Sequence, residues 1–81
     1  MNIKVKMPDL SATEGSEIAI GEWRVEVGQR VKRGDVLLEV ETDKAVQEVE
    51  CFTNGTVTAI HVQPGDTVSA GDLIATIQRG R

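Results

Sequence analysis

Aromatic residues are almost absent from this chain, which has one tryptophan, Trp23, one phenylalanine, Phe52, and no tyrosine. Because aromatic residues are so few, a core has to be built from Val, Ile, Leu and Ala. Hydrophobic residues make up 40% of the 81 residues. That content is sufficient for one small globular domain, although so short a chain buries little surface and has a thin margin of stability. Trp23 is expected to pack in this core or at its edge rather than to stack on a ligand, since no cluster of other aromatic residues accompanies it.

Cysteine and histidine each occur once, as Cys51 and His61. A single cysteine excludes an internal disulfide and a cysteine-based zinc site. His61 is interpreted as an ordinary strand residue without a serine or cysteine partner, and neither metal-ligand spacing nor a glycine-rich phosphate loop occurs. Cys51 shares its strand alternation with Val49, so we expect a small buried core residue rather than a reactive thiol. We predict that the domain is not an enzyme by itself and holds no metal.

An excess of basic residues and long apolar runs are missing too. The net charge is −4, and acidic residues concentrate in the middle of the chain. Nucleic-acid binding needs clustered Lys and Arg, so this composition argues against it. No secretory signal and no apolar run of membrane-spanning length is visible. We expect a soluble protein of a reducing compartment, with no nucleic-acid or membrane partner.

The sequence does contain short runs of alternating apolar and polar residues, which are typical of β-strands. Uninterrupted helical patterns of useful length are missing, so the prediction is an all-β fold. Asn54-Gly55 is predicted to form a turn, because both residues tolerate positive φ. The loop 9–16 is polar and interpreted as exposed. Strands are expected at 2–7, 18–23, 36–41, 45–51, through Val57 and Ile60, and at 73–77.

An internal repeat supports this fold class. A Gly-x-x-Val-x-x-Gly-Asp unit occurs twice, and each position of the second copy lies 37 residues after the first. Each copy predicts two tight turns at its glycines, one buried valine and an aspartate that accepts local N–H groups. Two like halves of about four short strands each suggest two small sheets packed face to face about a pseudo-twofold axis, with the central hairpin and the termini at opposite ends. The matching residues are Val25, Gly28, Val31, Gly34 and Asp35, and Val62, Gly65, Val68, Gly71 and Asp72.

The stretch Glu41-Thr42-Asp43-Lys44-Ala45 lies between two strand-like runs and is predicted to be the tip of a β-hairpin. There the Lys44 amine would be free in solvent. A convex, solvated tip cannot enclose a substrate or exclude water. It does suit a tethered cofactor, where the protein supplies position and the attached group supplies chemistry. The alternative is that Lys44 is only a solubilising surface charge.

These motifs carry a resemblance that covers essentially the whole chain. Together with Met7-Pro8-Asp9-Leu10 and Glu14-Gly15, the hairpin and the two repeats resemble the lipoyl domain of the dihydrolipoamide acyltransferase component of 2-oxo acid dehydrogenase complexes. This domain is a member of the biotinyl/lipoyl carrier family. The resemblance implies a flattened barrel of two four-stranded sheets, a domain at 1–78 and the start of a linker or a frayed end at 79–81. It also implies lipoate in amide linkage on Lys44.

The function implied by the resemblance is carriage of acyl groups and reducing equivalents. A lipoate-attaching enzyme would modify Lys44. The partners would be a thiamine-diphosphate-dependent 2-oxo acid decarboxylase, an acyltransferase core and the FAD-containing dihydrolipoyl dehydrogenase. Thr42, Asp43 and Ala45 would present the lysine, and Glu41 resembles an acidic recognition position. The loop 9–16 is either a recognition element or a plain surface loop. The isolated domain would be monomeric, in the bacterial cytoplasm rather than the mitochondrial matrix.

Some features depart from the family pattern, and alternatives stay open. Many relatives carry prolines shortly after the hairpin, where this chain has Glu50, Cys51 and Phe52, and no linker or acyltransferase core follows Arg81. We therefore expect an excised domain of a longer acyltransferase. Biotinyl carriers share the fold but flank their lysine with methionines, and the glycine-cleavage carrier lacks Thr-Asp before its lysine. An unmodified interaction domain of the same fold is the third alternative.

Overall fold

The computed structural model describes residues 1–10 and 17–79, and the chain in these ranges consists of β-strands joined by turns and loops. The predicted loop 9–16 therefore lies mostly outside the described residues. No helix long and apolar enough to cross a membrane occurs in the described part. The eight strands are β1 (Asn2–Lys6), β2 (Ile18–Trp23), β3 (Arg30–Val31), β4 (Val36–Glu41), β5 (Val46–Glu50), β6 (Gly55–Ile60), β7 (Thr67–Val68) and β8 (Leu73–Gln78).

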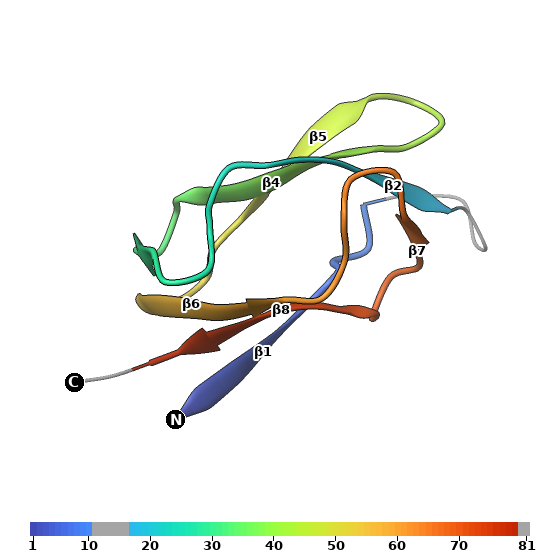
Figure 1. Cartoon of the computed structure of the whole chain (residues 1–81). Helices are drawn as coiled ribbons and strands as arrows, with labels where there is room; N and C mark the ends of the chain where they lie inside the picture. Colours follow the sequence, from blue (N-terminus) through green and yellow to red (C-terminus); the bar gives the residue numbers. More distant parts are fainter. Residues whose placement is uncertain (11–16, 80–81) are drawn as a thin grey trace.

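The strands form two four-stranded sheets with the orders β1-β8-β6-β3 and β5-β4-β2-β7. Every pairing is antiparallel. Exchanging each strand of the first half of the chain with its counterpart four strands later converts one order into the other. The all-β prediction, with two sheets related by a pseudo-twofold axis, is therefore confirmed (Figure 1).

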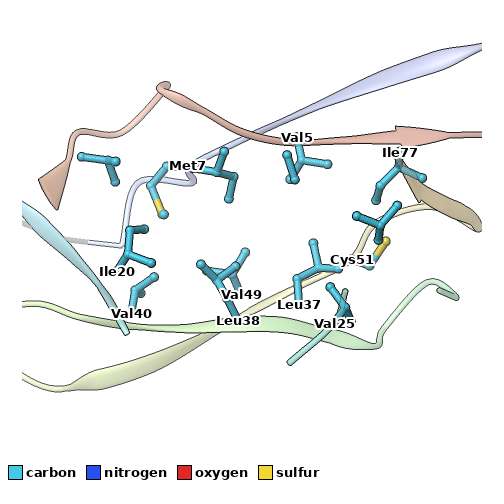
Figure 2. Packing of buried hydrophobic residues seen from close by; sticks show 14 of the residues in the cluster. Val5, Met7, Ile20, Val25, Leu37, Leu38, Val40, Val49, Cys51 and Ile77 are labelled. Atoms are coloured by element: carbon cyan, nitrogen blue, oxygen red, sulfur yellow. The ribbon is translucent and has the colours of Figure 1, made fainter. Parts of the chain in front are cut away.

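Aliphatic side chains fill the space between the sheets, as Figure 2 shows for Val5 and Ile77 on one side and Leu38, Val40 and Val49 on the other. Their exposed fractions are all 4% or lower. Fully burying one such side chain contributes about 1.5–3 kcal/mol, so the cluster provides the driving force that aromatic residues supply elsewhere. The remaining cluster members are Met7, Ile18, Ile20, Val25, Val31, Leu37, Cys51, Val57, Val68, Ile74 and Ala75.

Cys51 and Trp23 take the positions that the sequence predicts. Cys51 is only 3% exposed, and its thiol donates a hydrogen bond of 2.8 Å to the carbonyl of Thr53. Trp23 is partly buried against the core, and its indole N–H donates to the carbonyl of Val62 at 3.0 Å. Both residues therefore have structural roles with their polar atoms satisfied.

The two copies of the repeat have the same conformation. Gly34 and Gly71 have φ values of +97° and +93°, and Gly28 and Gly65 both have +95°. These values lie in the left-handed region, which glycine adopts without steric cost. The aspartate that ends each copy accepts a hydrogen bond of 2.9 Å from the N–H three residues earlier. The predicted turn roles of glycine and aspartate are confirmed.

Each glycine turn is also held by the opposite half of the chain. The N–H of Gly28 donates to the carbonyl of Val57 in β6, and the N–H of Gly65 donates to that of Ile20 in β2, at 2.7 and 2.9 Å. Gly34 and Gly71 make equivalent bonds to Cys51 and Met7, at 2.7 and 2.8 Å. The halves are thus interlocked, since the acceptors for all four glycine N–H groups lie in the opposite half.

The prediction that Asn54-Gly55 forms a turn with positive φ is wrong. Gly55 is the first residue of β6, and no non-glycine residue in the described ranges has positive φ. Glycine is required there because a Cβ would lie 2.5 Å from the carbonyl oxygen of Gln78 on β8. The position reflects a close approach between strands rather than a turn.

Several strand boundaries also differ from expectation. β1 ends at Lys6 rather than at residue 7, and β8 ends at Gln78 rather than at residue 77. The strand predicted at 45–51 spans only Val46–Glu50, because Ala45 belongs to the preceding turn. His61 lies just beyond the end of β6. It still continues the pairing with β8, since its N–H donates to the carbonyl of Ile74 at 2.9 Å and its Nε2 lies 2.9 Å from the hydroxyl of Thr76.

The molecule is elongated, with extents of 38 × 20 × 19 Å. The turn between β4 and β5 is at one end, and the N-terminus and the end of β8 are at the other (Figure 1). Asn2 pairs with Gln78 there, and the N–H of Arg79 donates to the carbonyl of Met1 at 2.8 Å. The predicted separation of hairpin and termini is confirmed.

The symmetry of the glycine turns yields a stability prediction. We expect Gly34→Ala and Gly71→Ala each to lower the free energy of unfolding by about 1–2 kcal/mol, because a side chain at positive φ is strained. No atom lies within 4 Å of a Cβ at either position, so the two losses should be similar. Urea unfolding measures them. Unequal losses, or none, would contradict the equivalence of the two copies.

Candidate functional site

The turn between β4 and β5 is formed by Thr42, Asp43, Lys44 and Ala45. Glu41 of β4 pairs with Val46 of β5, and the N–H of Thr42 donates to the carbonyl of Ala45 at 2.9 Å. No residue of the turn has positive φ. The two central residues therefore do not form the mirror-image turns common in two-residue hairpins.

The Thr42 side chain holds the turn together and is only 9% exposed. Its hydroxyl oxygen accepts hydrogen bonds from the N–H groups of Lys44 and Ala45, both at 3.3 Å. The same hydroxyl donates to the carbonyl of Ala45 at 3.2 Å. The sequence predicts only a presenting role for Thr42. The bonds within the turn could also have been predicted, because Ser and Thr hydroxyls often accept from the N–H groups two and three residues later.

Lys44 is exposed at the outermost part of the turn, and so are its neighbours Asp43 and Ala45. Its ammonium group makes no hydrogen bond or salt bridge with any other described residue; the salt bridge found in residues 1–10 and 17–79 joins Arg24 and Glu39. The arrangement is a primary amine on a short turn whose backbone is fixed by hydrogen bonds. Such an amine is accessible to an acylating enzyme.

The sheet that carries this turn has an acidic outer face. All five charged residues in its strands are glutamates, and Glu41 is next to the turn and exposed. Glu39 lies directly opposite Glu48, an arrangement that repels. Arg24 relieves the repulsion through its contact with the Glu39 carboxylate, which raises the pKa of the Arg24 guanidinium. The five residues are Glu22, Glu39, Glu41, Glu48 and Glu50.

One side chain links the hairpin to the segment around the loop 9–16. The amide Nε2 of Gln47 donates to the carbonyl of Leu10 at 3.3 Å. Leu10 is the last described residue before the gap, so the loop's role in recognition stays a prediction. No group of three or more His, Cys, Asp or Glu side chains suited to a metal ion occurs in the described ranges.

Comparison with known proteins places these features in a family. The Biotin_lipoyl family model, described as "Biotin-requiring enzyme", matches residues 3–77. Over 78 residues the chain is 42% identical to the dihydrolipoyllysine-residue acetyltransferase component of the pyruvate dehydrogenase complex from Zymomonas mobilis. The match covers 95% of this chain and 18% of that relative, so the chain spans about a fifth of the length of the curated relatives it matches.

Two solved structures resemble the whole fold. The lipoyl domain of the 2-oxoglutarate dehydrogenase complex from Azotobacter vinelandii matches with a TM-score of 0.77 and 30% identity, over 98% of this chain and 99% of that one. Kluyveromyces lactis urea carboxylase matches with a TM-score of 0.80 and 26% identity, over 96% of this chain and 6% of that one.

The comparisons favour the lipoyl over the biotinyl alternative. Over nearly the whole chain, the identity is 30% to the lipoyl domain and 26% to urea carboxylase. The curated relative is likewise a dihydrolipoyllysine acyltransferase component. The chain therefore belongs to the biotin/lipoyl family, as a lipoyl domain of the kind found in the acyltransferase components of 2-oxo acid dehydrogenase complexes.

Proposed function

We propose that Lys44 is the residue of this lipoyl domain that carries lipoate, bound through an amide to its ε-amine. The observation that carries the proposal is the exposed Lys44 amine on a turn fixed by the Thr42 hydroxyl. Amide formation requires an accessible, uncommitted amine, which fits this lysine. The other three lysines of the chain lie in β1 and in the turn after β3.

Lipoate, when bound, supplies a ring disulfide that accepts an acyl group and two electrons. The chain itself holds Lys44 in position. Thr42 fixes the turn, and Asp43 and Ala45 leave the lysine uncovered on both sides. The turn that contains Lys44 lies at one end of the elongated domain, beyond the ends of β4 and β5 (Figure 1), so the sheets leave the approach to this turn open. Rigid display of a flexible arm raises its local concentration at each active site within reach.

The wider role that we propose is that of a carrier within a 2-oxo acid dehydrogenase complex. The partners would be a lipoate-attaching enzyme, a thiamine-diphosphate-dependent decarboxylase, an acyltransferase core and dihydrolipoyl dehydrogenase. The pyruvate and 2-oxoglutarate dehydrogenase complexes named for the relatives support this assignment. We further propose that the domain comprises residues 1–78, since β8 ends at Gln78, and that it acts in the bacterial cytoplasm.

Mass spectrometry tests the attachment site. Co-expression with a lipoate-attaching enzyme and lipoate should give one mass increment, which peptide mapping places on Lys44. Lys44→Arg should abolish the increment and leave the fold intact, because the side chain is exposed. Lys32→Arg is the matched control and should still be modified.

Other outcomes of that experiment would support one of the two alternative functions. An increment equal to biotin would mean a biotinyl carrier, the reading that the likeness to urea carboxylase would favour. A folded wild-type domain that accepts no lipoate would mean an unmodified interaction domain. Either result would overturn the proposal.

The turn itself is tested at Thr42. Thr42→Val keeps the side-chain volume but leaves the Lys44 and Ala45 N–H groups without their acceptor, so we expect a loss of about 1–2 kcal/mol in unfolding free energy. The kcat/KM for lipoate attachment should fall as well. Thr42→Ser keeps the hydroxyl and should restore both quantities. Equal behaviour of the two variants would show that the hydroxyl does not position the lysine.

Recognition by the decarboxylase is tested at Glu41. With lipoylated protein, we expect Glu41→Gln to lower the kcat/KM of reductive acylation while leaving the unfolding midpoint unchanged, because Glu41 is exposed and next to the turn. Glu50→Gln is the matched control at the far end of β5 and should have little effect. Parallel assays with pyruvate, 2-oxoglutarate and branched-chain decarboxylases show which 2-oxo acid supplies the acyl group. Equal losses at both glutamates would remove the specific role of Glu41.

A further inference from the structure

The charges of this domain are divided between its two sheets. Every charged residue in the strands of the β5-β4-β2-β7 sheet is a glutamate, whereas the charged strand residues of the other sheet are Lys4, Lys6 and Arg30. The strands of the sheet that leads to Lys44 therefore contain no basic residue, although Arg24, just after β2, contacts Glu39 there. Most of the remaining basic residues lie at the end of the molecule opposite the β4–β5 turn.

Two adjoining hollows at that end share Asn54. One, of about 370 Å³, is lined by Arg30 and Lys32, and the other, of about 250 Å³, by Arg33 and Arg79. These four cations come from β3, from the turn that follows it and from the residue after β8. None of them forms a salt bridge with a described residue. We name these two hollows together the basic groove.

Hydrogen bonds hold the floor of the basic groove in place. The side-chain Oδ1 of Asn54 accepts from the N–H of Arg33 at 2.8 Å, and the Cys51 thiol donates to the carbonyl of Thr53. The one carboxylate in the lining, Asp35, accepts from the N–H of Lys32 at 2.9 Å through Oδ2 and keeps its negative charge. The lining therefore carries four cations against this one carboxylate.

Phe52 adds an apolar element to this surface. It lines the second hollow and is 56% exposed, which is unusual for a large aromatic side chain in a small domain. The β5–β6 connection that contains it is fixed by the bond from Gly34 N–H to the carbonyl of Cys51. Exposed aromatic residues next to arginines are typical of protein interaction surfaces.

We propose that the basic groove docks an acidic segment of a partner protein, with carboxylates facing the four cations and an apolar side chain on Phe52. Two cations line each hollow, so the charges suit a ligand with several separate carboxylates rather than one compact anion. The segments that line the basic groove lie at the end of the molecule opposite the β4–β5 turn that contains Lys44 (Figure 1), so a segment bound there leaves the lysine accessible. This inference does not depend on lipoate attachment.

The test uses ¹⁵N-labelled 81-residue chain and a short peptide of glutamates interrupted by leucines. Amide shifts are expected at Arg33, Phe52–Asn54 and Arg79, but not at 42–45, and affinity should fall as salt is raised. The combination Arg33→Gln with Arg79→Gln should weaken binding about fivefold or more. Lys4→Gln with Lys6→Gln removes the same charge from β1 and should bind like wild type. Phe52→Ser should abolish the preference for this peptide over one without leucine.

The remaining outcomes contradict the proposal. Equal weakening by both double variants would show only non-specific attraction to positive charge. Inorganic pyrophosphate that competes fully and shifts the same amides would indicate a small-anion site. Concentration-dependent shifts in the absence of peptide would mean that the groove binds the acidic face of a second copy. Dispersed amide spectra of all variants confirm that each result refers to folded protein.

Discussion

The structure depends on hydrogen bonds that each half of the chain provides to the turns of the other. The glycine turns of the first half donate to β6 and to the segment that follows β5, and those of the second half donate to β2 and to the segment that follows β1. Each such bond contributes about 0.5–1.5 kcal/mol, so each half is stabilised by the presence of the other. The aliphatic core likewise takes its residues from both sheets, so it forms only when both are assembled.

Features that depend on local chemistry could be read from the sequence, and features that depend on distant pairing could not. Alternation located most strands, and the paired glycines fixed the turns of the repeat, because φ > 0 is a property of one residue. The role of Gly55 cannot be predicted from its neighbours in the sequence, because its constraint comes from Gln78, which is adjacent only through the β6–β8 pairing. Lys44 could be singled out from its motif, whereas the bonds of the Thr42 hydroxyl required the turn geometry.

The division of charge links the fold to the site. The sheet that presents Lys44 is acidic, and Arg24 offsets the repulsion between Glu39 and Glu48 at its centre. Such a face favours approach to positively charged surfaces and disfavours negatively charged ones. Arg33 and Arg79 are 46 residues apart in the chain and share one hollow only because β8 ends beside the β5–β6 connection. The grouping of cations is therefore a product of topology.

The pairing of β1 with β8 has a mechanical consequence. β1 begins and β8 ends at the same end of the molecule, where Asn2 pairs with Gln78. Tension applied between residues 1 and 79 would therefore break the hydrogen bonds between these strands in sequence, starting from that end. Antiparallel strands pulled from the same end separate at lower force than strands sheared along their length. The hairpin that carries Lys44 belongs to the other sheet and lies far from this loading path. Stretching the ends would thus peel the β1–β8 pair before it disturbed the turn.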